Sequence, residues 1–219
     1  MCGRIVCYSP LEDIAVAVDA TLDPMATEVY QTSYNIPPSQ PLPIACQFES
    51  KRWLQIAKWG LLPHWAKDES FGFKTFNARA ETIREKPSFK GAFKSRRCLI
   101  PINGYYEWQR NGSSKLPYYF SPKNGRILTL AGLFEIWREE LLTCTVITTV
   151  ANEVTRSVHH RMPVIISEGD RATWLKASPD AAYATLKSAP LDLLKMHRVD
   201  RAVNNARQEG SELIAPSND

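Results

Sequence analysis

A chain of 219 residues is long enough to bury a sizeable core, in one large domain or two small ones. Hydrophobic content of 44% and charged content of 23% are typical of an ordinary globular protein, and no run of about twenty apolar residues could span a membrane. The net charge is +4, and basic residues cluster at 84–97 and at 195–207, which suits a polyanion as well as a solvated surface.

Five cysteines are scattered along the chain without a C-x-x-C pair, and the N-terminus carries no basic-then-apolar leader. We therefore expect no disulfide framework, no structural metal site and no secretion. The expected location is the cytoplasm, at the nucleoid in a bacterium, or the nucleus in a eukaryote.

The chain opens with Met1-Cys2-Gly3-Arg4. Removal of Met1 would leave Cys2 with a free α-amine beside its thiol, and both groups have accessible nucleophilic forms near neutral pH. Such a 1,2-aminothiol condenses with an aldehyde to an imine, and ring closure to a thiazolidine is then intramolecular. The alternative is an incidental thiol in a frayed terminus, so the other motifs must decide.

The first half of the chain mixes helix, strand and loop signals. Ser9-Pro10-Leu11-Glu12 predicts a capping box with proline at the first helical position, followed by a short amphipathic helix. Beyond it we predict a proline-rich loop at 31–43, strands at 43–48 and 53–58, an aromatic-rich loop at 59–74, and one or two short helices at 78–94 broken at Pro87.

The second half is rich in β-branched and aromatic residues. It predicts strands at 98–100, 104–110, 117–121, 126–134, 143–150 and 164–166, with hairpin turns at Asn111-Gly112 and Asn124-Gly125. Helices at 168–177 and 179–188 and a short strand at 196–200 follow. We predict an α+β fold, a single domain over 1–219, with a curved, largely antiparallel, barrel-like sheet and peripheral helices.

Three segments carry residues that could perform chemistry. In Asn77-Ala78-Arg79-Ala80-Glu81, the asparagine could cap a helix or hold an attacking amine, and Arg79 could grip a phosphate. In Gly104-Tyr105-Tyr106-Glu107-Trp108, strand alternation places Glu107 on one face with Tyr105, and burial there would raise the carboxyl pKa as a general acid–base requires. A surface Glu paired with a cation is the alternative.

The third segment, Val158-His159-His160-Arg161-Met162-Pro163, holds two of the four histidines. In extended backbone their rings would point opposite ways, so one could serve as a proton shuttle or phosphate partner. They are a poor metal pair because adjacent ligands rarely converge. The aromatic residues before Asn77 are mostly core, although one or two could stack on exposed bases.

These blocks, in this order and with a cysteine at position 2, resemble the SRAP family (SOS-response-associated peptidase). The resemblance extends to Ser33–Pro38, Trp59–Pro63 and Arg201–Ala206. It implies a DNA-damage protein that captures abasic sites in single-stranded DNA as a covalent crosslink, with Cys2 as nucleophile and Asn77, Glu107 and His159 as catalytic partners. The implied DNA-binding residues are Arg4, Asn35, Pro38, Trp65, Arg79, Trp108 and Arg161, and the loop at 66–76 departs from the pattern.

In the implied mechanism, Glu107 transfers protons while the sugar ring opens, the Cys2 amine forms an imine at C1′, and the thiol closes the thiazolidine. No cofactor or metal is needed, and a monomer is expected. The family label also implies thiol peptidase activity, self-processing and a lyase-like side reaction. Two rival interpretations are an N-terminal-nucleophile amidohydrolase, since glutamine amidotransferases also begin Met-Cys-Gly, and a non-catalytic single-strand-binding module.

Overall fold

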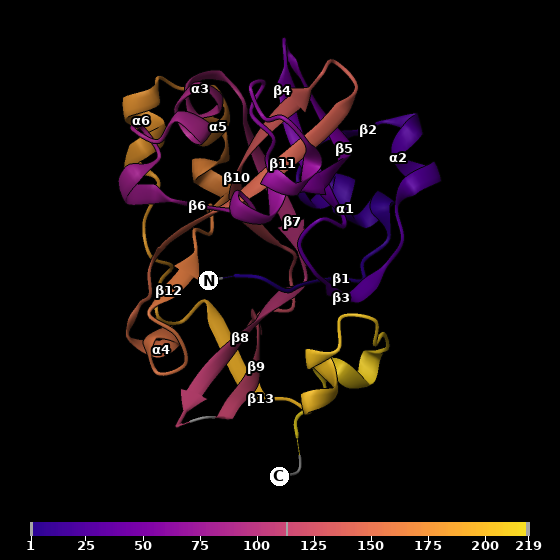
Figure 1. Ribbon diagram of the computed structural model, residues 1–219, viewed down its shortest axis with the longest axis vertical. Coiled ribbons are helices and arrows are strands. Elements are labelled where there is room, and N and C mark those ends of the chain that lie inside the picture. The colour runs from indigo at the N-terminus through magenta and orange to yellow at the C-terminus, as the bar shows by residue number, and fades with distance from the viewer. Residues whose placement is uncertain (1, 113, 218–219) are drawn as a thin grey trace.

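Two β-sheets form the framework of the computed structural model, which describes residues 2–112 and 114–217 (Figure 1). The larger sheet runs in the order β12-β11-β10-β7-β4-β5-β2, and β6 adds to β11. A parallel pairing of β5 with β11, at Thr143↔Lys58 and Cys144↔Trp59, closes the strands from β11 through β5 into a ring. The predicted α+β fold with a barrel-like core is therefore confirmed.

The strands of the larger sheet are β2 (Thr21–Leu22), β4 (Pro41–Phe48), β5 (Lys51–Trp59), β6 (Asn77–Arg79), β7 (Arg97–Ile102), β10 (Leu128–Trp137), β11 (Leu141–Val150) and β12 (Arg161–Pro163). The ring encloses the main hydrophobic core, and every residue of β7 is buried. Gly132 of β10 is required there, because a Cβ at this position would lie 2.7 Å from the Ile100 side chain.

The smaller sheet has the order β13-β9-β8-β1-β3. Its strands are β1 (Ile5–Cys7), β3 (Ser33–Ile36), β8 (Gly104–Asn111), β9 (Ser114–Pro122) and β13 (Leu194–Arg198). Figure 1 shows β8, β9 and β13 extending below the barrel, with the start of the chain running between the two parts. This placement brings the N-terminal residues to the junction of the sheets.

Helices lie around the barrel, as predicted. Figure 1 shows α3, α5 and α6 together on one side and α1 and α2 on the other. The α-helices are α1 (Leu11–Ala17), α2 (Pro24–Val29), α3 (Pro87–Ser95), α4 (Glu153–Arg156), α5 (Arg171–Lys176) and α6 (Pro179–Ala184). Shorter 3₁₀ turns are η1 (Glu69–Lys74), η2 (Ala80–Thr82), η3 (Glu168–Asp170), η4 (Arg201–Asn204) and η5 (Ser211–Ile214). Within the described ranges, no helix is long and apolar enough to cross a membrane.

Several local predictions were wrong. The capping box does not form: Pro10 is the N-cap of α1 without a side-chain bond, and the Ser9 hydroxyl instead accepts from Asn103 at 2.8 Å. The predicted loop at 31–43 contains β3, because β1 supplies its hydrogen-bonding partner. Asn77 begins a strand, β6, and caps no helix.

The two turn signals had different outcomes. Asn111-Gly112 was correct, since β8 and β9 pair up to Asn111↔Ser114 and Gly112 has a φ of +59°. At Asn124-Gly125 the chain does turn, with a φ of +70° at Gly125, but β9 and β10 belong to different sheets and form no hairpin. The predicted strand at 164–166 was wrong, because β11 pairs with the preceding residues of β12 and Ile165 forms only an isolated bridge with Leu130. The part of the predicted helical segment before Pro87 holds β6 and η2 instead of an α-helix. The remaining strand and helix predictions differ from the structure mainly at their boundaries.

Candidate active site

Cys2 lies completely buried where the two sheets meet. The Asn77 amide nitrogen donates to the Cys2 carbonyl at 2.6 Å, which fastens the first residues of the chain to β6. Burial raises the pKa of the Cys2 thiol far above its ordinary value, and the nearby Glu107 carboxyl adds to this effect. The thiol is therefore protonated at rest.

Glu107 of β8 is only 4% exposed. The predicted alternation is confirmed, because on the opposite face Tyr106 donates to the Tyr34 carbonyl and Trp108 donates to Asn204. Burial raises the pKa of Glu107, also as predicted. A raised pKa keeps the carboxyl group protonated to a higher pH than an exposed glutamate, which favours a role as proton donor.

His159 stands next to Glu107, with its Nδ1 atom 3.9 Å from Glu107 Oε1. The Arg161 backbone N–H donates to the same Nδ1 at 3.0 Å and fixes the ring. Burial lowers the pKa of His159, which favours the neutral imidazole. Of the two adjacent histidines, His159 is therefore the one that reaches the buried carboxyl group.

The predicted opposite orientation of the two histidine rings was wrong. Their centroids are 4.4 Å apart with an interplanar angle of 30°. The reason is the backbone, which is not extended here: the segment after α4 turns before β12 begins. His160 is exposed beside the partly buried His159.

The predicted phosphate-binding arginines differ in their availability. Arg79 is exposed on β6. Arg161 is 8% exposed and grips Glu81 through two hydrogen bonds of 2.6 and 2.9 Å, and it also donates to the Thr148 carbonyl at 2.7 Å. Arg161 thus holds β12, β11 and η2 together, whereas Arg79 presents its charge to solvent.

Asn35, which we expected to contact DNA, is instead completely buried. Its amide nitrogen donates to the carbonyls of Asn205 at 3.0 Å and Gln208 at 2.8 Å, and its oxygen accepts from Arg4 at 2.6 Å. Asn35 therefore holds the C-terminal segment and Arg4 in place. The Arg4 guanidinium in turn lies 5.8 Å from the centroid of the Trp108 ring.

Neither Pro38 nor Trp65 lines the cavity beside Glu107. Pro38 is partly exposed in the turn after β3. Trp65 is 45% exposed, packs edge-on against Phe71 at 5.0 Å, and lines a separate pocket with Lys67 and Lys74. The structure does not bring Trp65 among the residues that line the cavity at Glu107.

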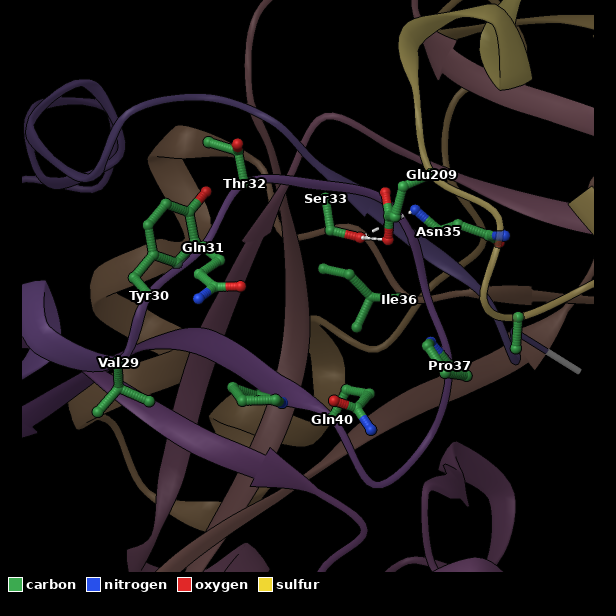
Figure 2. Close-up of a pocket in the computed structure, with 12 residues that line it drawn as sticks. Val29, Tyr30, Gln31, Thr32, Ser33, Asn35, Ile36, Pro37, Gln40 and Glu209 are labelled. Atoms are coloured by element: carbon green, nitrogen blue, oxygen red, sulfur yellow. Dashed lines mark hydrogen bonds between the residues drawn. The ribbon is translucent and has the colours of Figure 1, made fainter.

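Two pockets are lined by residues of the smaller sheet. One, of about 400 Å³, is lined by Glu107, Trp108, Arg110, Lys115, His159 and Asn204. The other, of about 510 Å³, lies between the residues around β3 and Glu209 and contains none of the predicted catalytic side chains. Figure 2 shows this second pocket, in which Glu209 accepts from the Ser33 hydroxyl at 2.5 Å.

The family model for the SOS response associated peptidase (SRAP) matches residues 1–206. The chain belongs to the SRAP family. Among relatives of this SRAP protein, the Bacillus subtilis "Abasic site processing protein YoaM" is 38% identical and the alignment covers 100% of this chain and 99% of the relative. The Xenopus tropicalis "Abasic site processing protein HMCES" is 32% identical over 98% of this chain and 78% of the relative.

A solved structure agrees with the fold of this SRAP protein. The crystal structure of a protein from Bacteroides thetaiotaomicron matches with a TM-score of 0.87 and 26% identity, covering 99% of this chain and all of that one. The match therefore includes both sheets.

Sequence reasoning missed Arg110, Lys115 and Asn204 in this SRAP protein, although all three line the Glu107 cavity. The Asn111-Gly112 signal does not predict the two basic residues as a pair, because the observed ladder still includes Asn111, opposite Ser114, and only this register places Arg110 opposite Lys115. No local signal places Asn204, which reaches Trp108 from a part of the chain 96 residues away. Within residues 2–112 and 114–217, no cluster of three or more His, Cys, Asp or Glu side chains could hold a metal.

Proposed function

We propose that this SRAP protein processes abasic sites in single-stranded DNA by forming a covalent crosslink through Cys2. The supporting observation is the bond from Asn77 to the Cys2 carbonyl, because it holds the N-terminal nucleophile beside a buried Glu107 with a raised pKa. The names of the relatives support the lesion as substrate. Each proposed catalytic residue comes from one chain, so a monomer suffices.

The first requirement is removal of Met1, which frees the Cys2 amine. The Asn77 amide nitrogen holds the Cys2 carbonyl, and its buried oxygen has no hydrogen-bond partner among the described residues. A buried acceptor without a partner is unfavourable, so the oxygen is well suited to accept from an amine. In this proposal Asn77 orients the amine for attack.

The chemistry then needs only proton transfers. An abasic deoxyribose is mostly a closed hemiacetal, and Glu107 protonates the ring oxygen and takes up the proton that the C1′ hydroxyl loses, giving the aldehyde. The amine adds to C1′, and one of its protons passes to the oxygen to form the carbinolamine. Glu107 protonates the carbinolamine hydroxyl, which leaves as water, and recovers the remaining proton from nitrogen as the imine forms. The thiol adds to the imine carbon and its proton passes to nitrogen, closing the thiazolidine without any change in oxidation state.

The remaining residues bind and orient the strand. His159, neutral and fixed by the Arg161 N–H, donates from its other ring nitrogen to the sugar or an adjacent phosphate. Arg79 offers an exposed guanidinium, and Arg4 is held beside the Trp108 ring. Arg161 acts through the position of His159, since its own side chain is engaged with Glu81.

The decisive experiment incubates the protein with abasic and intact single-stranded oligonucleotides and separates the products on a denaturing gel. Wild-type protein is expected to give a shifted band with the abasic strand alone. Cys2→Ala retains an amine, so the imine can form and cleave the strand by β-elimination, but no stable crosslink should remain. A denaturation-resistant band from Cys2→Ala excludes the thiazolidine.

The same experiment separates the rival interpretations. A non-catalytic single-strand binder would give no shifted band on a denaturing gel with either strand. An amidohydrolase would release ammonia from glutamine and ignore the lesion. Intact mass spectrometry of the purified protein shows whether Met1 has been removed, and a retained Met1 in crosslinking-competent protein contradicts the proposed nucleophile.

A further inference from the structure

A second groove continues from the Glu107 cavity along the far end of the β8–β9 hairpin. It has a volume of about 510 Å³ and shares Trp108, Arg110 and His159 with that cavity. Arg156 and His160, from α4 and the segment after it, form its opposite wall. Because the two spaces share these residues, anything leaving the cavity on this side enters the groove; we call it the hairpin groove.

The hairpin groove is held open by the fold. The Gln109 side chain on β8 donates to the Ser157 carbonyl at 2.8 Å and ties the hairpin to the end of α4. The helix itself is capped by Asn152, whose side chain accepts from the Thr155 N–H at 2.9 Å. Both walls are therefore positioned before any ligand binds.

The charges along the hairpin groove have one sign. Arg110 of β8 lines the groove, and its direct cross-strand partner, Lys115 of β9, lines the adjoining Glu107 cavity; both are exposed. Like charges placed opposite each other destabilise a hairpin unless an anion lies near them. Arg156 adds a third exposed cation, and within the described residues none of the three forms an ion pair.

The connection to the active site identifies the anion. If the Glu107 cavity receives the abasic sugar, the strand must continue out of it through phosphodiester links. The hairpin groove opens directly from that cavity, and it offers cations to the phosphates and the Trp108 ring to a base. Two guanidinium groups and one ammonium group suit a chain of phosphates better than a single ion.

We propose that the hairpin groove binds the sugar-phosphate backbone of the single strand on one side of the lesion, with Arg110 and Arg156 as phosphate contacts along the groove and Lys115 as a contact in the adjoining cavity. This inference rests on the proposed function. It adds the path by which the DNA strand leaves the Glu107 cavity and a preferred direction of the strand in the site. The protein would then require nucleotides on that side of the abasic site and tolerate their absence on the other.

The test uses a Lys115→Gln, Arg156→Gln double variant, which leaves Arg110 beside His159 untouched. Binding is measured over a range of salt concentrations with three single-stranded oligonucleotides, carrying the lesion near the 5′ end, in the middle or near the 3′ end. Loss of two phosphate contacts should reduce the slope of log K against log salt by about 1.4. The reduction should appear with the central lesion and with only one of the two terminal ones.

Two further variants keep the result interpretable. Lys115→Arg preserves the charge and should retain the wild-type slope. Lys90→Gln removes an exposed lysine from α3 and should change nothing, because α3 lines neither the cavity nor the groove. Thermal unfolding of each variant checks that the fold is intact.

If the double variant keeps the wild-type slope with all three oligonucleotides while the wild-type protein still crosslinks the lesion, the hairpin-groove proposal is overturned and the proposed function stands. An equal reduction at both terminal lesions also overturns it, since no single exit path would then exist. If wild-type protein crosslinks none of them, the proposed function itself fails.

Discussion

Asn35→Ala should release the C-terminal segment from the smaller sheet. The substitution deletes a charged hydrogen bond from Arg4, at 2.6 Å, and two amide bonds to the carbonyls of Asn205 and Gln208, at 3.0 and 2.8 Å. A buried bond to a charged group contributes about 2 kcal/mol and a neutral one about 1 kcal/mol. The free energy of unfolding should therefore fall by about 4 kcal/mol, which lowers the melting temperature by roughly 8 to 16 °C.

Two measurements test this prediction. Urea unfolding gives the loss of stability, and hydrogen exchange should show faster exchange in η4 and η5, which lie on either side of the anchored carbonyls of Asn205 and Gln208. Crosslinking of abasic DNA should slow as well, because Arg4 loses one of its fixed partners and Asn204 can move away from Trp108.

A matched control is Gln47→Ala, which removes an amide whose bond to the Glu49 carbonyl is exposed, at 3.0 Å. That change should cost less than about 0.5 kcal/mol. If Asn35→Ala destabilises the protein no more than Gln47→Ala does, then Asn35 is no internal brace and our account of Arg4 positioning is wrong.

Two more substitutions test the site and the sheet beneath it. Burial raises the pKa of Glu107, so the folded protein keeps a proton that the unfolded chain releases, and stability falls as the pH rises from the unfolded pKa through the folded one. Glu107→Gln should thus be more stable than wild type at neutral pH, and this difference in stability should vanish below about pH 4. The variant should also crosslink abasic DNA slowly. Urea titrations that show the same difference in stability at every pH would contradict the pKa shift. Gly104→Ala should cost about 3 kcal/mol, because its Cβ would lie 2.5 Å from the Phe120 carbonyl oxygen and closer still to the Tyr119 ring, whereas Gly169→Ala, with open space around it, should be neutral in the same assay.

Local patterns predicted the parts of this fold that are themselves local. The turn at Asn111-Gly112, the alternation around Glu107 and the break at Pro87, where α3 begins, each depend on neighbouring residues, and the structure contains all three. The closure of the barrel does not depend on neighbouring residues, because the parallel β5–β11 pairing joins Lys58 to Thr143, which lie far apart in the sequence. A proline-rich composition also concealed β3, whose strand character depends on β1.

The same distinction applies to the site. Burial of Glu107 followed from its aromatic neighbours, but Asn35 looked like a loop residue because its partners lie about 170 positions away. The sequence likewise suggested that Arg161 binds phosphate, but in the structure its guanidinium group is hydrogen-bonded to Glu81, 80 residues earlier. A sequence shows which polar groups its residues carry, whereas the tertiary fold decides which other groups of the protein bind to them.

The burial of Cys2 has a consequence for how long the protein stays competent. A thiol that is fully enclosed and protonated reacts slowly with peroxides and with alkylating agents, which attack the thiolate. In the proposed chemistry each molecule reacts once, so a thiol lost to a passing oxidant cannot be recovered by turnover. Burial of the thiol would therefore keep the protein able to react until the aldehyde of an abasic site reaches Cys2.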